Sequence, residues 1–259
     1  MLLLQIYEKY FTFRLAKYKI FFVPIQKFPF SHMNSSPKKN LPLPQNNLNE
    51  QMQYWDSVAA EKKFHTQFDA EIFIKYVNPT DVVLDFGCGY GRILGELIKY
   101  KFNHLYGADF SEQMLDLARK TYPNVIFKKN NDIDISYQNE FFDAIILSAV
   151  LGCIAGESQQ KYLIKEILRV LKPGGILYLA DFIINDDEYN LKRYQEFPNS
   201  NEFPYGVFHV AGGAVLRHHT EEHIRQILSQ FDIKIFHKTT FKTMDNKTSN
   251  GFILIAKKL

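Results

Sequence analysis

Two aspartates and three glycines in the first half of the chain have the types and spacing of a nucleotide-like binding site. Asp85 stands just before the pattern formed by Gly87, Gly89 and Gly91, and Asp109 follows 24 residues after Asp85. Glycine lets the backbone approach a ligand closely, because it has no Cβ atom. An acid about 20 residues after such a loop can accept hydrogen bonds from both hydroxyls of a ribose. The spacing predicts a site for a ribose-containing cofactor, and a tight turn alone is the alternative explanation for the glycines.

The same loop argues against a nicotinamide cofactor. A dinucleotide-binding loop reads G-x-G-x-x-G, and Arg92 occupies the position of its third glycine here. A nicotinamide-dependent oxidoreductase is therefore the disfavoured alternative among enzyme classes.

Alternating strand and helix patterns must position these residues. Apolar runs predict strands at DVVLDF, HLYGADF, NVIFKK, FFDAIILSAV and GILYLADFII, and helical periodicity predicts helices at ILGELIKY, SEQMLDLARKTY and QQKYLIKEILRVL. Ser111 and Thr220 suit N-caps, and KPGG is expected to end the third helix. A further helix is expected after Thr220, followed by strands at DIKIFHKTTF and GFILIAKK.

These patterns predict an α/β fold with a doubly wound, mostly parallel seven-stranded sheet. The final two strands have only a loop between them, so they must be antiparallel, and the last strand enters the sheet reversed. Ligands in such sheets bind at the carboxyl ends of the strands, where the glycine loop lies.

The chain divides by composition near Gln53. Residues 1–53 are expected to be a poorly ordered extension ending in a Pro- and Asn-rich linker, and residues 54–259 the folded domain, with 46% hydrophobic residues in the whole chain. Residues 1–33 contribute +4 to the formal net charge of +3. The rest is nearly neutral, which gives no electrostatic reason to expect nucleic-acid binding.

The N-terminus is apolar but broken by charges. Its longest apolar run is far shorter than the roughly 20 residues of a membrane-spanning helix, and it lacks the features of a secretory signal. Weak membrane-surface contact by residues 1–28 is one hypothesis, and a start at Met33 with a dispensable extension is the other. Cys88 and Cys153 have no paired spacing, which indicates a reducing, cytoplasmic location.

The motifs together resemble those of class I S-adenosylmethionine-dependent methyltransferases. VLDFGCGYGR followed by LYGADFSEQMLDLAR is similar to that family's first motif and its sequel, and the likeness continues through NNDI, FDAIILSAVLGCI and LRVLKPGGILYLADF. It runs from about Trp55 to the C-terminus. A reversed last strand is also typical of that family.

The resemblance implies a site for S-adenosyl-L-methionine. Asp85 and the three glycines would approach the methionine part, Ser148 would line it, and Asp109 would hold the ribose. Around the adenine, the resemblance implies Phe110, Met114, Asp132 and Ile133, and Tyr54 and Trp55 would cover the cofactor. Met114 as ordinary core and Asp132 as a turn residue are the alternatives. The family's usual helix between the third and fourth strands is expected to be very short or missing.

The acceptor side is predicted in an insertion at residues 185–219. Its aromatic residues could line an acceptor pocket or form the underside of a lid. His209, Arg217, His218 and His219 are candidates for contacting an acceptor or supplying a base, and a simple helix start is the alternative for the histidines. The HHTEEH run does not match a metal-binding spacing, so no metal is expected.

These observations predict a methyltransferase that acts on a small molecule by in-line displacement. A base is needed only if the acceptor must lose a proton, so the absence of a recognisable catalytic pair does not count against it. The alternatives are a protein or RNA methyltransferase and a non-catalytic cofactor-binding protein on the same fold. The oligomeric state stays open.

Overall fold

The computed structural model describes residues 48–58, 66–131, 133–210, 213–243 and 247–259. All of them belong to one compact unit, Pro42–Leu259. The expected extension up to residue 47 and the expected adenine contact Asp132 lie outside the described residues. The expected boundary at Gln53 falls inside helix α1 (Leu48–Val58). Among the described residues, no helix has the length and apolar character needed to cross a membrane.

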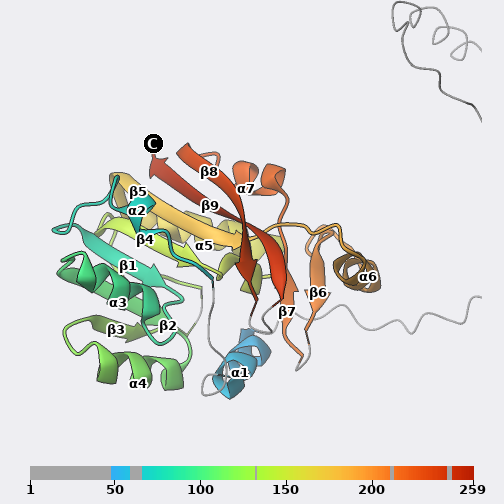
Figure 1. Ribbon diagram of the computed structural model, residues 1–259, viewed down its shortest axis with the longest axis horizontal. Coiled ribbons are helices and arrows are strands. Elements are labelled where there is room, and N and C mark those ends of the chain that lie inside the picture. The colour runs from blue at the N-terminus through green and yellow to red at the C-terminus, as the bar shows by residue number, and fades with distance from the viewer. Residues whose placement is uncertain (1–47, 59–65, 132, 211–212, 244–246) are drawn as a thin grey trace, which may run out of the picture. The chain divides into compact units, whose positions relative to one another are not determined.

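A seven-stranded sheet forms the centre of the domain, with the strand order β3-β2-β1-β4-β5-β9-β8 (Figure 1). Strand β9 runs antiparallel to both of its neighbours, and the other adjacent pairs are parallel. This confirms the predicted fold class and the reversed last strand. The strands are β1 (Val82–Phe86), β2 (His104–Asp109), β3 (Ile126–Lys129), β4 (Phe142–Ser148), β5 (Leu171–Phe182), β8 (Phe231–Lys242) and β9 (Thr248–Lys258).

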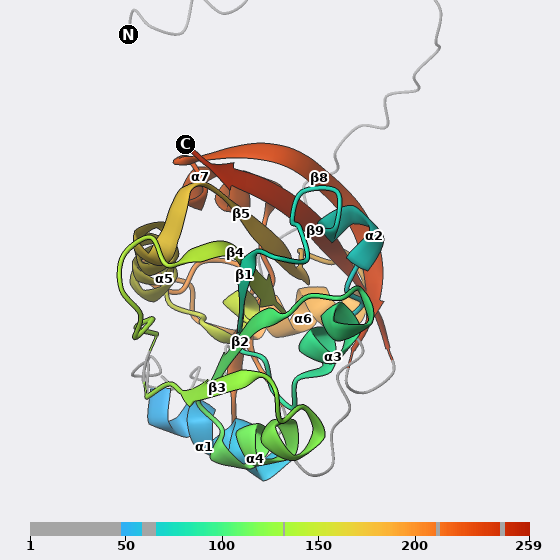
Figure 2. The ribbon, with the colours of Figure 1, turned by 90° about the vertical axis from the view of Figure 1, so that its left-hand side faces the viewer.

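Helices cover both faces of the sheet, because the central strands are apolar on both sides (Figure 2). Alternate residues of one strand pack into different clusters: Ile145 faces α5 and α7, while Ile146 faces α2 and α3. This is the alternation expected of a doubly wound fold. The covering helices are α2 (Ala70–Phe73), α3 (Arg92–Lys99), α4 (Glu112–Thr121), α5 (Glu157–Val170) and α7 (Glu221–Ile227).

The structure confirms the predicted first residues of two helices, whereas a third helix ends differently from the prediction. The side chains of Ser111 and Thr220 accept hydrogen bonds from the backbone N–H three residues on, as N-caps do. Helix α5 ends at Val170, but β5 begins at Leu171, before KPGG. Leu171 already pairs with Phe142, and a register shift after that pair accommodates the KPGG segment within the strand.

The segment at residues 185–219 contains helix α6 (Glu188–Glu196) and a two-stranded ribbon, β6 (Val207–His209) and β7 (Val215–Arg217). In Figure 1 these elements lie beyond the carboxyl ends of β4 and β5, and α1 lies beside them. The Gln51 side chain of α1 donates a hydrogen bond of 2.6 Å to the carbonyl oxygen of Val215. This bond ties α1 to the ribbon. A short 3₁₀ helix, η1 (Leu151–Cys153), follows β4, and no helix separates β3 from β4 among the described residues.

Candidate functional site

The glycine loop turns sharply between β1 and α3, and its backbone needs glycine. Gly87, Gly89 and Gly91 all have positive φ angles, of 78°, 52° and 81°. A Cβ atom on Gly87 would lie only 2.3 Å from a methyl carbon of Val150 in the loop after β4. The glycines therefore allow both a left-handed backbone and a close approach of two loops, which a turn alone would not require.

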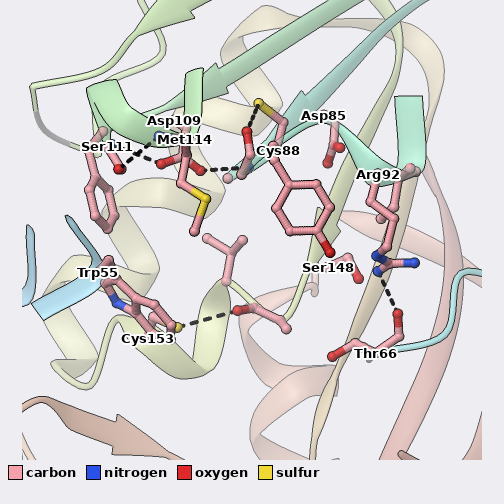
Figure 3. A pocket seen from close by; sticks show the side chains of 17 residues that line it. Trp55, Thr66, Asp85, Cys88, Arg92, Asp109, Ser111, Met114, Ser148 and Cys153 are labelled. Carbon is pink, nitrogen blue, oxygen red and sulfur yellow. Dashed lines mark hydrogen bonds between the residues drawn. The ribbon is translucent and has the colours of Figure 1, made fainter. Parts of the chain in front are cut away.

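Asp85 and Ser148 place unpartnered oxygen atoms beside this loop (Figure 3). Asp85 Oδ2 and Ser148 Oγ are buried, and neither has a hydrogen-bond partner in the described structure. Burial raises the pKa of Asp85 to about 7, against the opposing effect of the Arg92 charge. Buried polar atoms are normally hydrogen-bonded. These two acceptors therefore fit a ligand that brings donors, such as a primary ammonium group.

Asp109 closes the same site from the end of β2. Its Oδ2 accepts a hydrogen bond of 2.8 Å from the Gly89 N–H, and its Oδ1 accepts one of 2.9 Å from the Ser111 N–H. Burial raises its pKa, and these backbone donors oppose the rise. Each carboxylate oxygen can accept a second bond. The carboxylate therefore orients the glycine loop and still has acceptor sites for ligand hydroxyls.

Most of the residues expected to bind the cofactor line one cavity of about 100 Å³ or a smaller one that adjoins it. Gly91 and Tyr54 are not among the lining residues: Gly91 is the residue before α3, and the Tyr54 ring packs edge-on against Trp55 at 5.1 Å. The first cavity is lined by Trp55, Asp85, Gly87, Gly89, Asp109, Phe110, Met114 and Ser148, and the adjoining one by Ile133 together with Trp55, Gly87, Asp109 and Phe110.

The structure adds lining residues that the sequence analysis did not assign to the site. Arg92 lines the first cavity and donates a hydrogen bond of 2.6 Å to the carbonyl oxygen of Thr66, which is also a lining residue. Ala149 and Val150 enter from the loop after β4, and Cys153 from η1. Ala149 has a positive φ of 56°, a conformation that no sequence signal for alanine indicates.

A second cavity of about 420 Å³ adjoins the first. Both are lined by Trp55, Thr66, Ala149 and Cys153. The other lining residues come from η1, the end of β5, the insertion and the turn between β8 and β9: Gly152, Asp181, Phe182, Asp187, Tyr189, Asn190, Arg193, Phe208, Val210, Leu216, Arg217, His218, Lys242, Thr243, Lys247, Thr248 and Ser249. Two ligands that filled the two cavities would therefore meet at the shared residues.

Asp181 is a further acid at a strand end, and the sequence analysis missed it. It follows the pattern of Asp85 and Asp109, since it lies at the end of β5, so its position was a usable signal. Its Oδ2 accepts from the Gly152 N–H at 2.9 Å and its Oδ1 from its neighbour, Phe182 N–H, at 2.8 Å. Burial raises its pKa to about 6.

The four candidate acceptor-side residues occupy different environments. Arg217 is 4% exposed and forms an ion pair of 2.9 Å with Glu157, so it joins β7 to α5. His219 is buried beside it, and burial holds the pKa of His219 well below its usual value. His209 packs on Phe197, with 5.0 Å between ring centroids, and does not line either cavity. Arg217 and His218 do line the second cavity.

His218 is buried against two polar side chains. The Asn185 amide orientation is fixed, since its Oδ1 accepts from the Asn250 N–H and its Nδ2 donates to the Ile183 carbonyl. That Nδ2 lies 3.3 Å from His218 Nδ1, and the Tyr194 hydroxyl lies 2.6 Å from the same atom. Asn185 Nδ2 has two hydrogens and lies closer to the Ile183 carbonyl oxygen and to Ser249 Oγ, at 2.9 and 3.0 Å. The nearest partner of His218 Nδ1 is therefore the Tyr194 hydroxyl, which can donate or accept. Burial lowers the pKa of His218 to about 3, so the ring is neutral.

No group of three or more His, Cys, Asp and Glu side chains within the described ranges is arranged to hold a metal ion. His223, which completes the HHTEEH run, instead contacts the Gln160 side chain through Nε2 at 2.8 Å. Gln160 also donates to the carbonyl oxygens of Leu151 and Ile154. This network supports η1 rather than a ligand.

Comparison with known proteins places this geometry among methyltransferases. The family model described as "Methyltransferase domain" matches residues 83–175. The chain is 30% identical over 139 residues to probable methyltransferase ltbC of Aspergillus luteorubrus, covering 49% of each chain. It is 32% identical over 141 residues to demethylmenaquinone methyltransferase of Chlorobaculum parvum, covering 54% of each chain. A tRNA (carboxymethyluridine(34)-5-O)-methyltransferase of Arabidopsis thaliana is 29% identical over 119 residues, which are 46% of this chain and 28% of that protein.

The chain thus spans about half or less of the length of these curated relatives. A solved structure from Methanosarcina mazei, described as a SAM-dependent methyltransferase, matches with a TM-score of 0.69 at 29% identity and covers 74% of this chain and 99% of that chain. The family model and this structure agree with each other and with the site: residues 83–175 match a methyltransferase domain, and the described domain is similar to class I S-adenosylmethionine-dependent methyltransferases, whose cofactor is S-adenosyl-L-methionine.

Proposed function

We propose that this chain transfers a methyl group from S-adenosyl-L-methionine to a small-molecule acceptor. The observation that carries the proposal is the pair of adjoining cavities, which share Trp55, Thr66, Ala149 and Cys153. The first contains the acceptor atoms and glycine loop that suit the cofactor, and the second is large enough for another small ligand.

Each group in the first cavity has a chemical counterpart in the cofactor. Ionised Asp85, with Ser148, would accept hydrogen bonds from the ammonium group, and Asp109 would accept them from the ribose hydroxyls. The loop from Gly87 to Gly91 would lie against the methionine part. Around the adenine we assign Phe110, Met114 and Ile133, together with Asp132, and we assign Trp55 and Tyr54 to the cover.

The protein's contribution to the reaction would be positional. When bound, the cofactor supplies an electrophilic methyl group on a sulfonium sulfur. The residues of the two cavities would hold the acceptor in line with that group and exclude water, an effect that can contribute roughly 7–11 kcal/mol. A nucleophile that has no proton to lose needs no base. Where a proton must leave, Asp181 is the titratable acid of the second cavity that lies at a strand end.

Two observations favour a small molecule over a nucleic acid. The second cavity is bounded by the insertion and by the turn between β8 and β9, and the chain beyond residue 33 is nearly neutral. One similar protein is a demethylmenaquinone methyltransferase, although another is a tRNA methyltransferase.

We also propose a cytoplasmic location, which the free Cys88 and Cys153 support.

A two-stage experiment tests this function. Calorimetric titration should show binding of S-adenosylhomocysteine and no binding of NAD. Incubation of the protein with methyl-labelled cofactor and a size-fractionated metabolite extract should then transfer the label to a low-molecular-weight product. Binding of NAD alone would contradict the cofactor assignment, and transfer only to RNA or protein fractions would contradict the acceptor class.

A further inference from the structure

The wall of the second cavity contains Arg193, which forms no salt bridge with an acid of the described residues, although its charge helps to lower the pKa of Asp187. The Arg193 Cζ atom is 3.6 Å from the centroid of the Phe208 ring and 5.0 Å from that of Tyr189. All three residues line the cavity. Stacking on aromatic rings holds the plane of a guanidinium and leaves the donors at its edge free to bind an anion.

The local hydrogen bonds satisfy only part of this group. Arg193 Nη2 donates to the Asn190 side chain, while its Nε is buried without a partner. No carboxylate of the described residues lies within 4.0 Å of it: Asp187, also in the wall, caps α6 and accepts from the Asn190 backbone and side chain. A buried donor without a partner is unusual in a native protein, and here a ligand that occupies the cavity could supply the acceptor.

Two lysines extend the positive charge across the cavity. Lys247 Nζ lies 4.0 Å from the centroid of the Tyr189 ring, and Lys242 Nζ donates to Thr248 Oγ1 at 3.1 Å. Neither lysine forms an ion pair with an acid of the described chain. The remaining cation of the wall, Arg217, is neutralised by Glu157. Among the described residues of the wall, three cations without an ion pair, Arg193, Lys242 and Lys247, therefore stand against two such acids, Asp181 and Asp187.

The rest of the wall indicates a flat and largely apolar body. Phe182, Phe208 and Trp55 contribute aromatic surface. His218 contributes a neutral polar ring. An acid group on an aromatic or conjugated ring would match this combination of stacking surface and cations.

We propose that the acceptor is a small planar molecule that carries a carboxylate, which Arg193 binds with help from Lys247. This rests on the proposed function, since it specifies the acceptor of the same reaction. It makes Arg193 a residue that determines specificity: it selects anionic acceptors over neutral molecules of the same shape.

Matched acid and amide fragments test the proposal directly. Ligand-observed NMR would measure the affinities of benzoate and benzamide, and of 2-naphthoate and 2-naphthamide, with the full chain in the presence and absence of S-adenosylhomocysteine. Each acid should bind about tenfold or more tightly than its amide, because a charge-assisted hydrogen bond to a planar cation distinguishes them. Added salt should reduce the preference.

Variants assign the preference to Arg193. Arg193→Met should bring the acid-to-amide ratio close to one, and Lys192→Met, at the preceding residue with a 76% exposed side chain, should leave it unchanged. Lys247→Met is a second variant on another element, and it should lower the ratio by a smaller factor. Melting temperatures would establish that each variant is folded.

The outcomes separate this proposal from the function on which it rests. Acids and amides that bind equally, no binding by any acid, or a preference that survives Arg193→Met would overturn the acceptor assignment, even when S-adenosylhomocysteine binds normally. Methylation of a tRNA pool that the acids do not inhibit would also overturn it. A protein that does not bind S-adenosylhomocysteine would contradict the proposed function itself.

Discussion

Binding of the cofactor should release a proton from Asp85. Burial raises the pKa of this carboxyl to about 7 in the cofactor-free protein, so much of it is protonated at neutral pH. A positively charged ammonium group favours the ionised form. If the bound state requires ionised Asp85, each pH unit below the pKa weakens binding about tenfold. The dissociation constant of S-adenosylhomocysteine should therefore be about 100-fold higher at about pH 5 than at about pH 8.

Calorimetry in buffers of different ionisation enthalpy measures this directly. Near pH 6, wild-type protein should release about one proton per S-adenosylhomocysteine bound. Asp85→Asn should bind more weakly and release almost none. Asp181→Asn is the matched control, since Asp181 is also a buried acid at a strand end but lies in the second cavity. Its release should resemble that of the wild type. A wild-type affinity that does not change with pH, or unchanged release in Asp85→Asn, would refute this reasoning.

The same shift has the opposite effect on the stability of the cofactor-free protein. A folded-state pKa of about 7 against an ordinary value of 3.8 means that the folded state holds its proton more tightly than the unfolded state. The free energy of unfolding therefore falls as pH rises from about 4 to about 7. Asp85→Asn removes this loss and should stabilise the cofactor-free protein above pH 7 by up to about 4 kcal/mol, measured by urea denaturation.

Three further substitutions probe the loop, the buried ion pair and the ribose site. Gly87→Ala should weaken binding of S-adenosylhomocysteine and lower the melting temperature more than Gly213→Ala does. Gly213 also has a positive φ, but a Cβ atom added there would have no atoms within 4 Å. Equal effects of the two substitutions would show that the contact between the loops is unimportant. Arg217→Met should cost about 1.5–3 kcal/mol of unfolding free energy because it removes the buried charge-assisted hydrogen bond to Glu157. Lys161→Met, which removes a 58% exposed partner of the same acid, should cost less than about 1 kcal/mol; similar losses in urea denaturation would argue against this ranking. Asp109→Asn should raise the dissociation constant for S-adenosylhomocysteine about tenfold or more, and calorimetry showing wild-type affinity would remove Asp109 from the ribose site.

The sequence by itself determined the sheet and the edge of the sheet at which the glycine loop and its two aspartates meet. Apolar runs, N-caps and glycine spacing are local signals, and a strand followed by a glycine loop predicts a ligand at the sheet edge wherever the rest of the chain lies. That is why the grouping of the glycine loop, Asp85 and Asp109 around one cavity could be predicted, and their role in cofactor binding stays a prediction. The start of β5 could not, because the pairing of Leu171 with Phe142 depends on a neighbouring strand and outweighs the local signal of KPGG.

Only the tertiary structure decided which side chains line the second cavity and which of them form ion pairs. Arg193 meets Phe208 because α6 folds against β6, and Arg217 meets Glu157 because β7 packs near α5. His218 contacts Asn185, 33 residues earlier in the chain, and Tyr194, 24 residues earlier. Contacts between residues so far apart leave no periodic pattern in the sequence. The sequence also does not distinguish an arginine that forms an ion pair from one that does not. Packing of the insertion on the carboxyl end of the sheet determines which cation is paired and which remains available for a ligand.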